Sequence, residues 1–152
     1  MNSIRIEKKD IYTIEVNDNG DTIEFDLVDI ELPFKCERAL NEVNRVYRDL
    51  KAKLVIIEKQ EDRQLDNEVM TANEKAKLEA HRTAFKEMRA AMDAFLGDGA
   101  CQKIFGSRNY LEMFDDLFEQ LEPHLEKMKI NTQGISDRIK AKYSKKNDGV
   151  MR

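Results

Sequence analysis

Six apolar residues in the first half of the chain recur at alternating spacings of three and four positions: Leu40, Val43, Tyr47, Leu50, Leu54 and Ile57. This spacing places all six on one side of an α-helix, and we call the row the apolar seam. The seam predicts a long helix from about Phe34 to about Gln64, with Pro33 in its first turn, where the missing N–H group is not needed. Because a single amphipathic helix gains its stability from packing, other parts of the chain must cover the seam.

A second amphipathic segment can provide this cover. Thr71-Ala72-Asn73-Glu74 fits a capping box, in which the threonine hydroxyl accepts a hydrogen bond from the first turn of a helix. Gly97-Asp98-Gly99 marks the other end. The pattern therefore predicts a helix over roughly Ala72–Leu96, paired with the first as an antiparallel helical hairpin over residues 34–96. Its expected apolar side is formed by Leu78, Phe85, Met88, Met92 and Phe95. In this arrangement the seam belongs to the core of the domain.

Shorter helices are expected after the helical hairpin. Ala100–Phe105 reads as one short helix. Asn109 and Glu112 fit the N-cap and N3 positions of another, which carries the most apolar segment of the chain, residues 110–121. Pro123 should kink or restart that helix, because proline lacks the N–H group that an interior turn requires.

A β-hairpin is predicted at the start of the chain, after a strand-like arm in which Ile4 and Ile6 alternate with charged residues. Residues 11–16 and 22–27 alternate between apolar and polar side chains around a turn sequence with Asn19-Gly20. Asn-Gly favours a two-residue type I′ turn. That turn predicts three apolar pairs on one face, Val16 with Ile23, Ile14 with Phe25 and Tyr12 with Leu27, and a like-charge pair, Glu15 with Glu24, on the other.

The predicted fold class is therefore mainly α with a small N-terminal β-hairpin (α+β). A single domain is expected over residues 1–143, with the β-hairpin region at 1–32, the helical hairpin at 34–96 and C-terminal helices at 100–143. The last of these is a basic helix over 135–143. Residues 144–152 are expected to form a disordered basic tail.

Charge is distributed unevenly, although the net charge of the 152 residues is only −4. Residues 11–32 contain seven acids and no Lys or Arg, whereas residues 138–152 contain six bases and one acid. These regions can act as solvated faces, or they can pair within the molecule, between copies or with a third party.

No pattern indicates catalysis, a cofactor or a metal site. His81 and His124 stand apart from one another and from Cys36 and Cys101, and no spacing typical of metal ligands occurs. Both cysteines are expected to be free and buried. No apolar run is long enough to cross a membrane, and the short basic tail is weak support for nucleic-acid binding. The sequence thus favours a non-enzymatic protein that needs no cofactor and resides in the cytoplasm.

The segment IFGSRNYLEMFDDLFEQLEPHLEKM, from Ile104 to Met128, resembles the C-terminal part of tail assembly chaperones of tailed phages and prophages of Gram-positive bacteria. The order of a β-rich start, a long helix, a charged middle and this segment is similar too. The resemblance implies a protein of the bacterial host's cytoplasm that binds the tape-measure protein and helps to recruit tail-tube protein. It also implies that a longer, frameshifted product can exist. It transfers no catalytic residue.

Two hypotheses follow from these observations. The first is a non-catalytic phage tail assembly chaperone, with candidate partner contacts at Phe114, Leu117, Phe118 and Leu121, although core packing also explains most of these residues. The alternative is a structural or adaptor protein of a phage or prophage particle that self-associates through its amphipathic helices, as a homo-oligomer.

Overall fold

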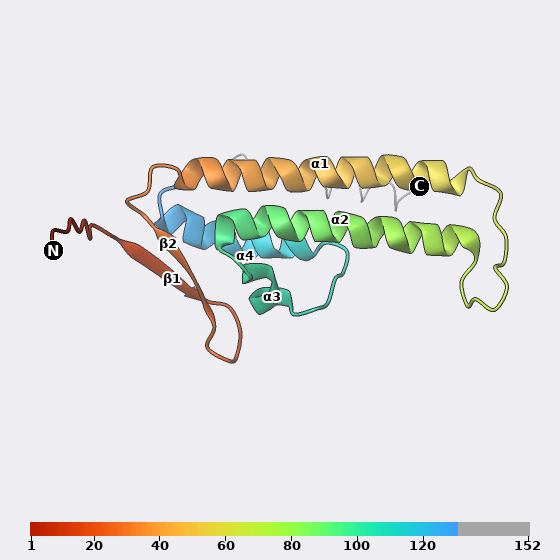
Figure 1. Cartoon of the computed structure of the whole chain (residues 1–152). Coiled ribbons are helices and arrows are strands. Elements are labelled where there is room, and N and C mark those ends of the chain that lie inside the picture. Colours follow the sequence, from red (N-terminus) through yellow and green to blue (C-terminus); the bar gives the residue numbers. More distant parts are fainter. Residues whose placement is uncertain (131–152) are drawn as a thin grey trace.

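The computed structural model describes residues 1–130, and six elements follow one another in them (Figure 1): β1 (Ile11–Glu15), β2 (Thr22–Asp26), α1 (Leu32–Glu58), α2 (Ala72–Leu96), α3 (Ala100–Phe105) and α4 (Met113–Lys127). The two strands form an antiparallel hairpin and the rest is helical, so the predicted α+β fold class is confirmed. The predicted basic helix over 135–143 and the predicted disordered tail at 144–152 lie outside the described residues.

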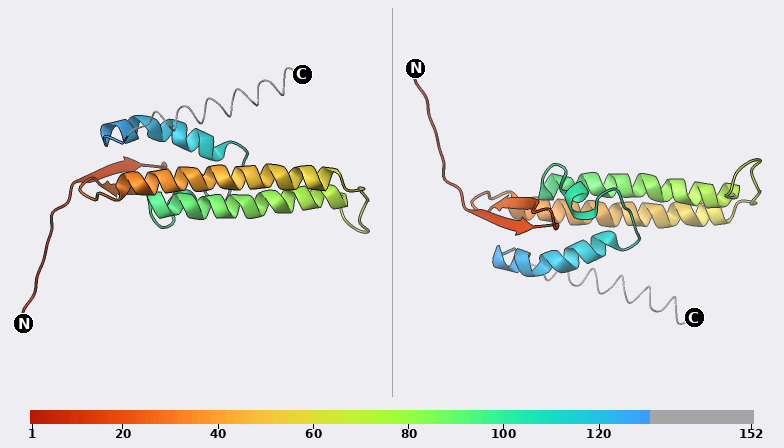
Figure 2. Two further views of the ribbon diagram at one scale, coloured as in Figure 1. Left: turned by 90° about the horizontal axis from the view of Figure 1, so that it is seen from above. Right: turned by 90° about the horizontal axis from the view of Figure 1, so that it is seen from below.

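The long helices α1 and α2 run antiparallel, and α4 lies along one side of the pair, over the half nearer the β-hairpin (Figure 2). The apolar seam faces inward, with Val43, Leu50 and Ile57 all buried. From α2, Met88 and Met92 are fully enclosed. The predicted bounds of α2 are confirmed, and its N-cap Thr71 Oγ1 accepts a hydrogen bond from the Glu74 N–H group at 3.2 Å. The seam is thus part of the core.

Leu78 was expected on the apolar side of α2, and this prediction is wrong, because its side chain is 56% exposed. Phe85, two turns further along α2, stacks on Phe114 of α4 with ring centroids 6.3 Å apart. Among the described elements, α4 covers α2 from about this point towards the β-hairpin (Figure 2). Leu78 lies beyond that cover, on the half nearer the loop between α1 and α2.

The prediction that α1 reaches Gln64 is also wrong, because the helix ends at Glu58. Side chains of Asp62 in the following segment and of Asn73 in the first turn of α2 bind backbone groups across the loop, which competes with continuing the helix. Asp62 Oδ1 accepts from the N–H groups of Arg63 at 2.8 Å and Asn73 at 3.0 Å, and Asn73 Nδ2 donates to the Gln60 carbonyl at 3.0 Å. These bonds shape a loop of residues 59–71 that reverses the chain.

The β-hairpin has a register two residues away from the predicted one. Tyr12 faces Phe25 and Ile14 faces Ile23, and Glu15 lies opposite Thr22, so the expected pair of Glu15 with Glu24 does not form. The cause is a longer turn: the Val16 N–H group donates to the Asp21 carbonyl at 2.9 Å, which closes a loop of residues 17–20. A shift of two residues leaves each side chain on its predicted face, because strand side chains alternate with period two.

Asn17 shapes this turn. Its Oδ1 accepts from the N–H groups of Asn19 at 2.9 Å and Asp21 at 3.2 Å, so the side chain replaces backbone partners inside the loop. Gly20 takes a positive φ of 83°, which glycine adopts at little cost. The hairpin then packs on the helices through Phe25, whose ring lies 5.3 Å from that of Phe95 in α2.

The C-terminal helices differ from expectation at one boundary. The short helix α3 has its predicted bounds, but α4 begins at Met113 rather than Tyr110, with Glu112 in the left-handed region before it. Asn109 does not cap the helix, because its Oδ1 accepts from Arg89 Nε at 2.8 Å, while Arg89 Nη2 donates to the Arg108 carbonyl at 2.8 Å. Of the two outcomes predicted for Pro123, a kink or a restart, the restart does not occur, since α4 continues through this residue to Lys127.

The packing predicts a contrast between two identical substitutions. Leu125 in α4 is 0% exposed, whereas Leu78 is 56% exposed. Leu125→Ala should lower the free energy of unfolding by about 2–5 kcal/mol through lost burial and a cavity. Leu78→Ala should change it by less than about 0.5 kcal/mol. Urea denaturation followed by circular dichroism measures both. Equal effects would contradict the placement of α4 against the helical hairpin.

The loop between α1 and α2 predicts a pH-dependent effect. The Asn73 N–H group binds the Asp62 carboxylate and lowers the pKa of this group below its ordinary value of 3.8. A lowered pKa in the folded state stabilises the protein above pH 3.8, and the contribution is lost as pH falls through the folded-state pKa. Asp62→Asn should therefore be less stable than wild type at neutral pH, and the difference should close in acid. Asp66→Asn removes a carboxylate from the same loop and is the matched control for the change in net charge.

Candidate partner-binding surfaces

The four predicted partner contacts lie in the core. Phe114, Leu117, Phe118 and Leu121 all sit on the buried side of α4. Phe114 packs between Phe85 of α2 and Phe105 of α3, with ring centroids 6.3 and 5.8 Å away. Core packing, the alternative explanation of these side chains, therefore describes where they lie, and they are not an exposed surface. Contact with a partner through them requires α4 to separate from α2.

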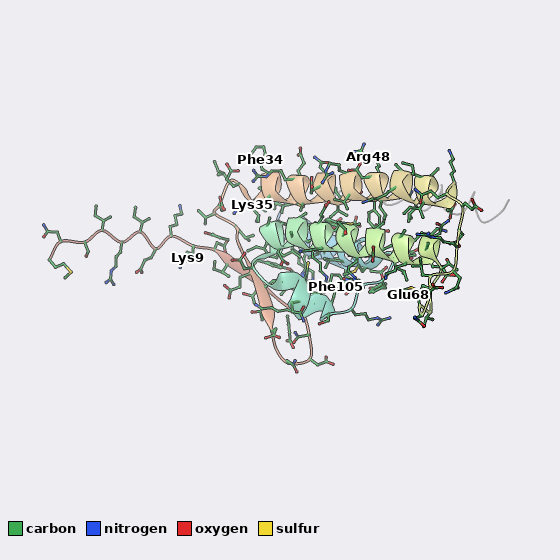
Figure 3. The ribbon with its side chains drawn as sticks, turned by 45° about the vertical axis from the view of Figure 1, so that its right-hand side comes forward. Lys9, Phe34, Lys35, Arg48, Glu68 and Phe105 are labelled. Atoms are coloured by element: carbon green, nitrogen blue, oxygen red, sulfur yellow. The ribbon has the colours of Figure 1, made fainter. Side chains whose placement is uncertain are left out.

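Self-association through the apolar seam meets the same obstacle. Leu40, Val43 and Leu50 are buried within the chain, so the face that the adaptor hypothesis would use is already covered. Phe34 and Ile56 are the large apolar residues of α1 that are most exposed, and neither belongs to the seam. Phe34 projects from the outer side of α1 near its start (Figure 3).

A groove of about 580 Å³ lies between α1 and α2. Its lining residue Ala90 lies on the other side of α2 from Phe85, which contacts α4, so the groove faces away from α4. Alanines dominate its α2 wall, with Ala80, Ala84, Ala90 and Ala91, and Val46 and Leu50 contribute apolar atoms from α1. A second hollow shares Ala91 with it and continues towards the start of α1. Short side chains let the backbone of another helix come close, as in tightly packed helix pairs. We call the two hollows together the alanine groove.

Basic side chains along the alanine groove form ion pairs with neighbouring carboxylates. In its central part Arg45 binds three carboxylates, those of Glu42, Asp49 at 2.7 Å and Glu87 at 3.6 Å. The hydrogen bond from Arg45 lowers the pKa of the Glu42 carboxyl. These pairs are exposed and contribute little stability, but they link α1 to α2 and balance the charge of Arg45. Towards the start of α1 the lining carries Lys35 and Arg38, which pair with Asp29 at 3.5 Å and with Glu31 at 3.9 Å.

The alanine groove was not found from the sequence, although part of its signal was present. Glu42, Arg45 and Asp49 follow one another at spacings of three and four, which places them on one helix face. The contribution of Glu87 depends on how α2 packs against α1, and no local pattern reports it. The alanines of α2 predict that another helix packs closely against it. They do not predict that part of this alanine face remains uncovered.

The two cysteines are free and buried, as predicted. Burial raises the pKa of the Cys36 thiol to about 11 and that of the Cys101 thiol to about 12, and Asp93 adds to the second shift. A thiolate is the reactive form of cysteine, so both side chains are poor nucleophiles near neutral pH. Their surroundings are those of structural residues.

The histidines make structural contacts. His81 Nδ1 donates to the Lys77 carbonyl within α2 at 2.8 Å, and His124 of α4 forms a hydrogen bond with the Tyr12 hydroxyl of β1 at 2.7 Å. Within residues 1–130, no group of three or more His, Cys, Asp or Glu side chains is placed to hold a metal ion. Over the same residues, none of the helices combines the length and the apolar character needed to span a bilayer.

The thiol environments predict an alkylation result. In the folded protein, Cys36 and Cys101 should stay unmodified by iodoacetamide at about pH 8, because both are buried and protonated. Both should react once the chain is unfolded in guanidinium, as intact-mass spectrometry will show. An Ala52→Cys variant, at an exposed position of α1, is the control and should be labelled in the folded state. Rapid labelling of the native cysteines would contradict their burial.

Residues 19–149 match the sequence model of a family described as "Family of unknown function (DUF6673)", and the chain therefore belongs to that family. The match begins in the turn of the β-hairpin and covers β2 and the helices α1, α2, α3 and α4. No curated protein and no solved structure matches the chain.

Proposed function

We propose that this family member is a non-catalytic tail assembly chaperone of a tailed phage or prophage, which binds the tape-measure protein and assists assembly of the tail tube. The observation that carries the proposal is the resemblance of residues 104–128 to the C-terminal part of such chaperones. These residues contain the end of α3, the turn after it and all of α4. The resemblance thus covers a structural unit that packs on the helical hairpin.

The alanine groove is the surface that suits this function. Tape-measure proteins are long, hydrophobic and helical, so a chaperone for them must cover apolar helix faces before assembly. The alanines of α2 allow a helix to lie close, and the apolar atoms of Val46 and Leu50 lie at the base of the contact.

This assignment moves the partner contacts from α4 to the opposite side of the helical hairpin. Binding through Phe114 or Phe118 would first expose the core, whereas the alanine groove is open in the folded chain. Binding through α4 requires free energy to open the core, whereas binding in the alanine groove does not, so experiment can distinguish the two. Substitution in the groove disturbs only the second.

Co-expression with the tape-measure protein encoded by the same phage or prophage tests the proposal. The chaperone should keep this partner soluble and should elute with it from a sizing column. If the partner stays insoluble and no complex elutes, the proposal is wrong. Recovery of the chain as a stoichiometric component of purified particles would instead support the structural or adaptor alternative.

The groove itself is tested by adding charge to it. Ala90 and Ala94 are exposed residues of its α2 wall, so Ala90→Glu with Ala94→Glu places carboxylates where the partner helix must lie without opening the core. The double variant should weaken binding about tenfold or more. Ala52→Glu, at an exposed position outside the groove lining, is the matched control and should bind normally. Unchanged binding by the double variant would exclude the alanine groove as the site.

A further inference from the structure

The first ten residues leave the folded body as an extended arm. They form no helix or strand, and every one of them is exposed (Figures 1 and 3). Three large apolar residues lie on this arm, Met1, Ile4 at 90% and Ile6 at 86% exposure. At its base, the Asp10 carbonyl accepts from the Leu27 N–H group at 2.8 Å, so the arm continues directly from β1.

The outer edge of β1 is free to pair with another strand. The hydrogen bonds of Val16 to Asp21 and of Leu27 to Asp10 show that the even-numbered residues of β1 bond to β2. In that alternation the backbone groups of Ile11, Thr13 and Glu15 point away from β2. All three residues are exposed, and no hydrogen bond of the described residues involves these backbone groups. An open edge of this kind is a template for strand addition.

The side chains of the arm agree with the pleat of β1. Even-numbered residues of β1, such as Tyr12 and Ile14, point towards the helices and are half-buried. Continuing the same alternation puts Ile4 and Ile6 on that face and Arg5 on the solvent side. The arm therefore carries an apolar row suited to extend the inner face of a sheet.

We propose that two copies of the chain exchange their arms, each arm adding antiparallel to the β1 edge of the other copy. A twofold axis at Lys9 gives a consistent register. The residues that then lie opposite one another are Ile4 and Ile14 of the second copy, Ile6 and Tyr12 of the second copy, and Lys8 and Asp10 of the second copy. All three pairs fall on the inner face. The odd-numbered residues supply the hydrogen bonds, and these are the backbone groups that β2 leaves free.

The charges of the arm and of the β-hairpin favour a second copy of the chain as the partner of the β1 edge. Residues 1–9 contain Arg5, Lys8 and Lys9 against the single acid Glu7, whereas residues 11–32 contain seven acids and no base. In the proposed register Arg5 lies opposite Thr13 and diagonal to Glu15 of the second copy. The two Lys9 residues meet at the axis, and each has Glu7 of the other copy as a diagonal neighbour. The arm leads away from the helices, so the axis places the two bodies at opposite ends of the new sheet (Figure 2).

The oligomeric state of the full chain tests this proposal independently of its function. Light scattering after size exclusion should report a dimer. Ile4→Asp with Ile6→Asp should weaken dimerisation about a hundredfold or more, because it removes the two apolar pairs on each arm. The arm touches the rest of its own chain at its base alone, so urea denaturation of the variant monomer should be unchanged. Ile30→Asp, at an exposed site outside the arm, is the control and should remain dimeric. A monomeric wild type, or a double variant that stays dimeric, would overturn the proposal.

Cysteine cross-linking tests the register. Lys9→Cys lies on the twofold axis and should form a disulfide-linked dimer under mild oxidation. Asn2→Cys, on the same arm, would lie opposite Val16 of the second copy and should not cross-link with itself. Equal cross-linking of the two variants would show two mobile arms in random contact and would contradict the exchange.

Discussion

The fold depends on one helix that is apolar on more than one side. Met88 and Met92 of α2 are fully enclosed, because α1 packs on one flank and α4 on another. The same helix receives the β-hairpin through Phe25 on Phe95, and α3 follows it directly. Methionine suits such a position, since its flexible side chain fills the irregular space where several elements meet. The helices α1, α3 and α4 and the strand β2 thus all contact α2, and β1 is held through its pairing with β2.

Local chemistry explains which elements could be predicted from the sequence. The bounds of α2 follow from Thr71 at one end and Gly97 at the other, and both signals act within a few residues of the helix they limit. The apolar seam identified the inward face of α1 for the same reason. Helical period and capping do not depend on what a helix packs against.

The errors arise where a side chain has a competing partner. Asn17 forms its own bonds inside the hairpin loop and overrides the preference of Asn19-Gly20 for a tighter turn. Asn109 is bound by Arg89, which is 20 positions earlier in the chain and adjacent to it only after folding. Phe114 and Leu117 show the same limit for the site, because an apolar helix face looks identical in sequence whether it enters a core or binds a partner. The alanine groove was missed since it needs two helices to exist.

The β-hairpin is fastened to the helices at both of its ends. At the turn end, the Lys103 carbonyl of α3 accepts from Asn17 Nδ2 at 3.0 Å, and Lys103 Nζ donates to the Thr22 carbonyl at 3.3 Å. At the other end, Tyr12 is bonded to His124 of α4. Two fixed points on one rigid ribbon determine its direction. The helices therefore set the direction in which the first ten residues leave the molecule. A substitution of Lys103 or His124 would change that direction, although neither residue contacts the arm.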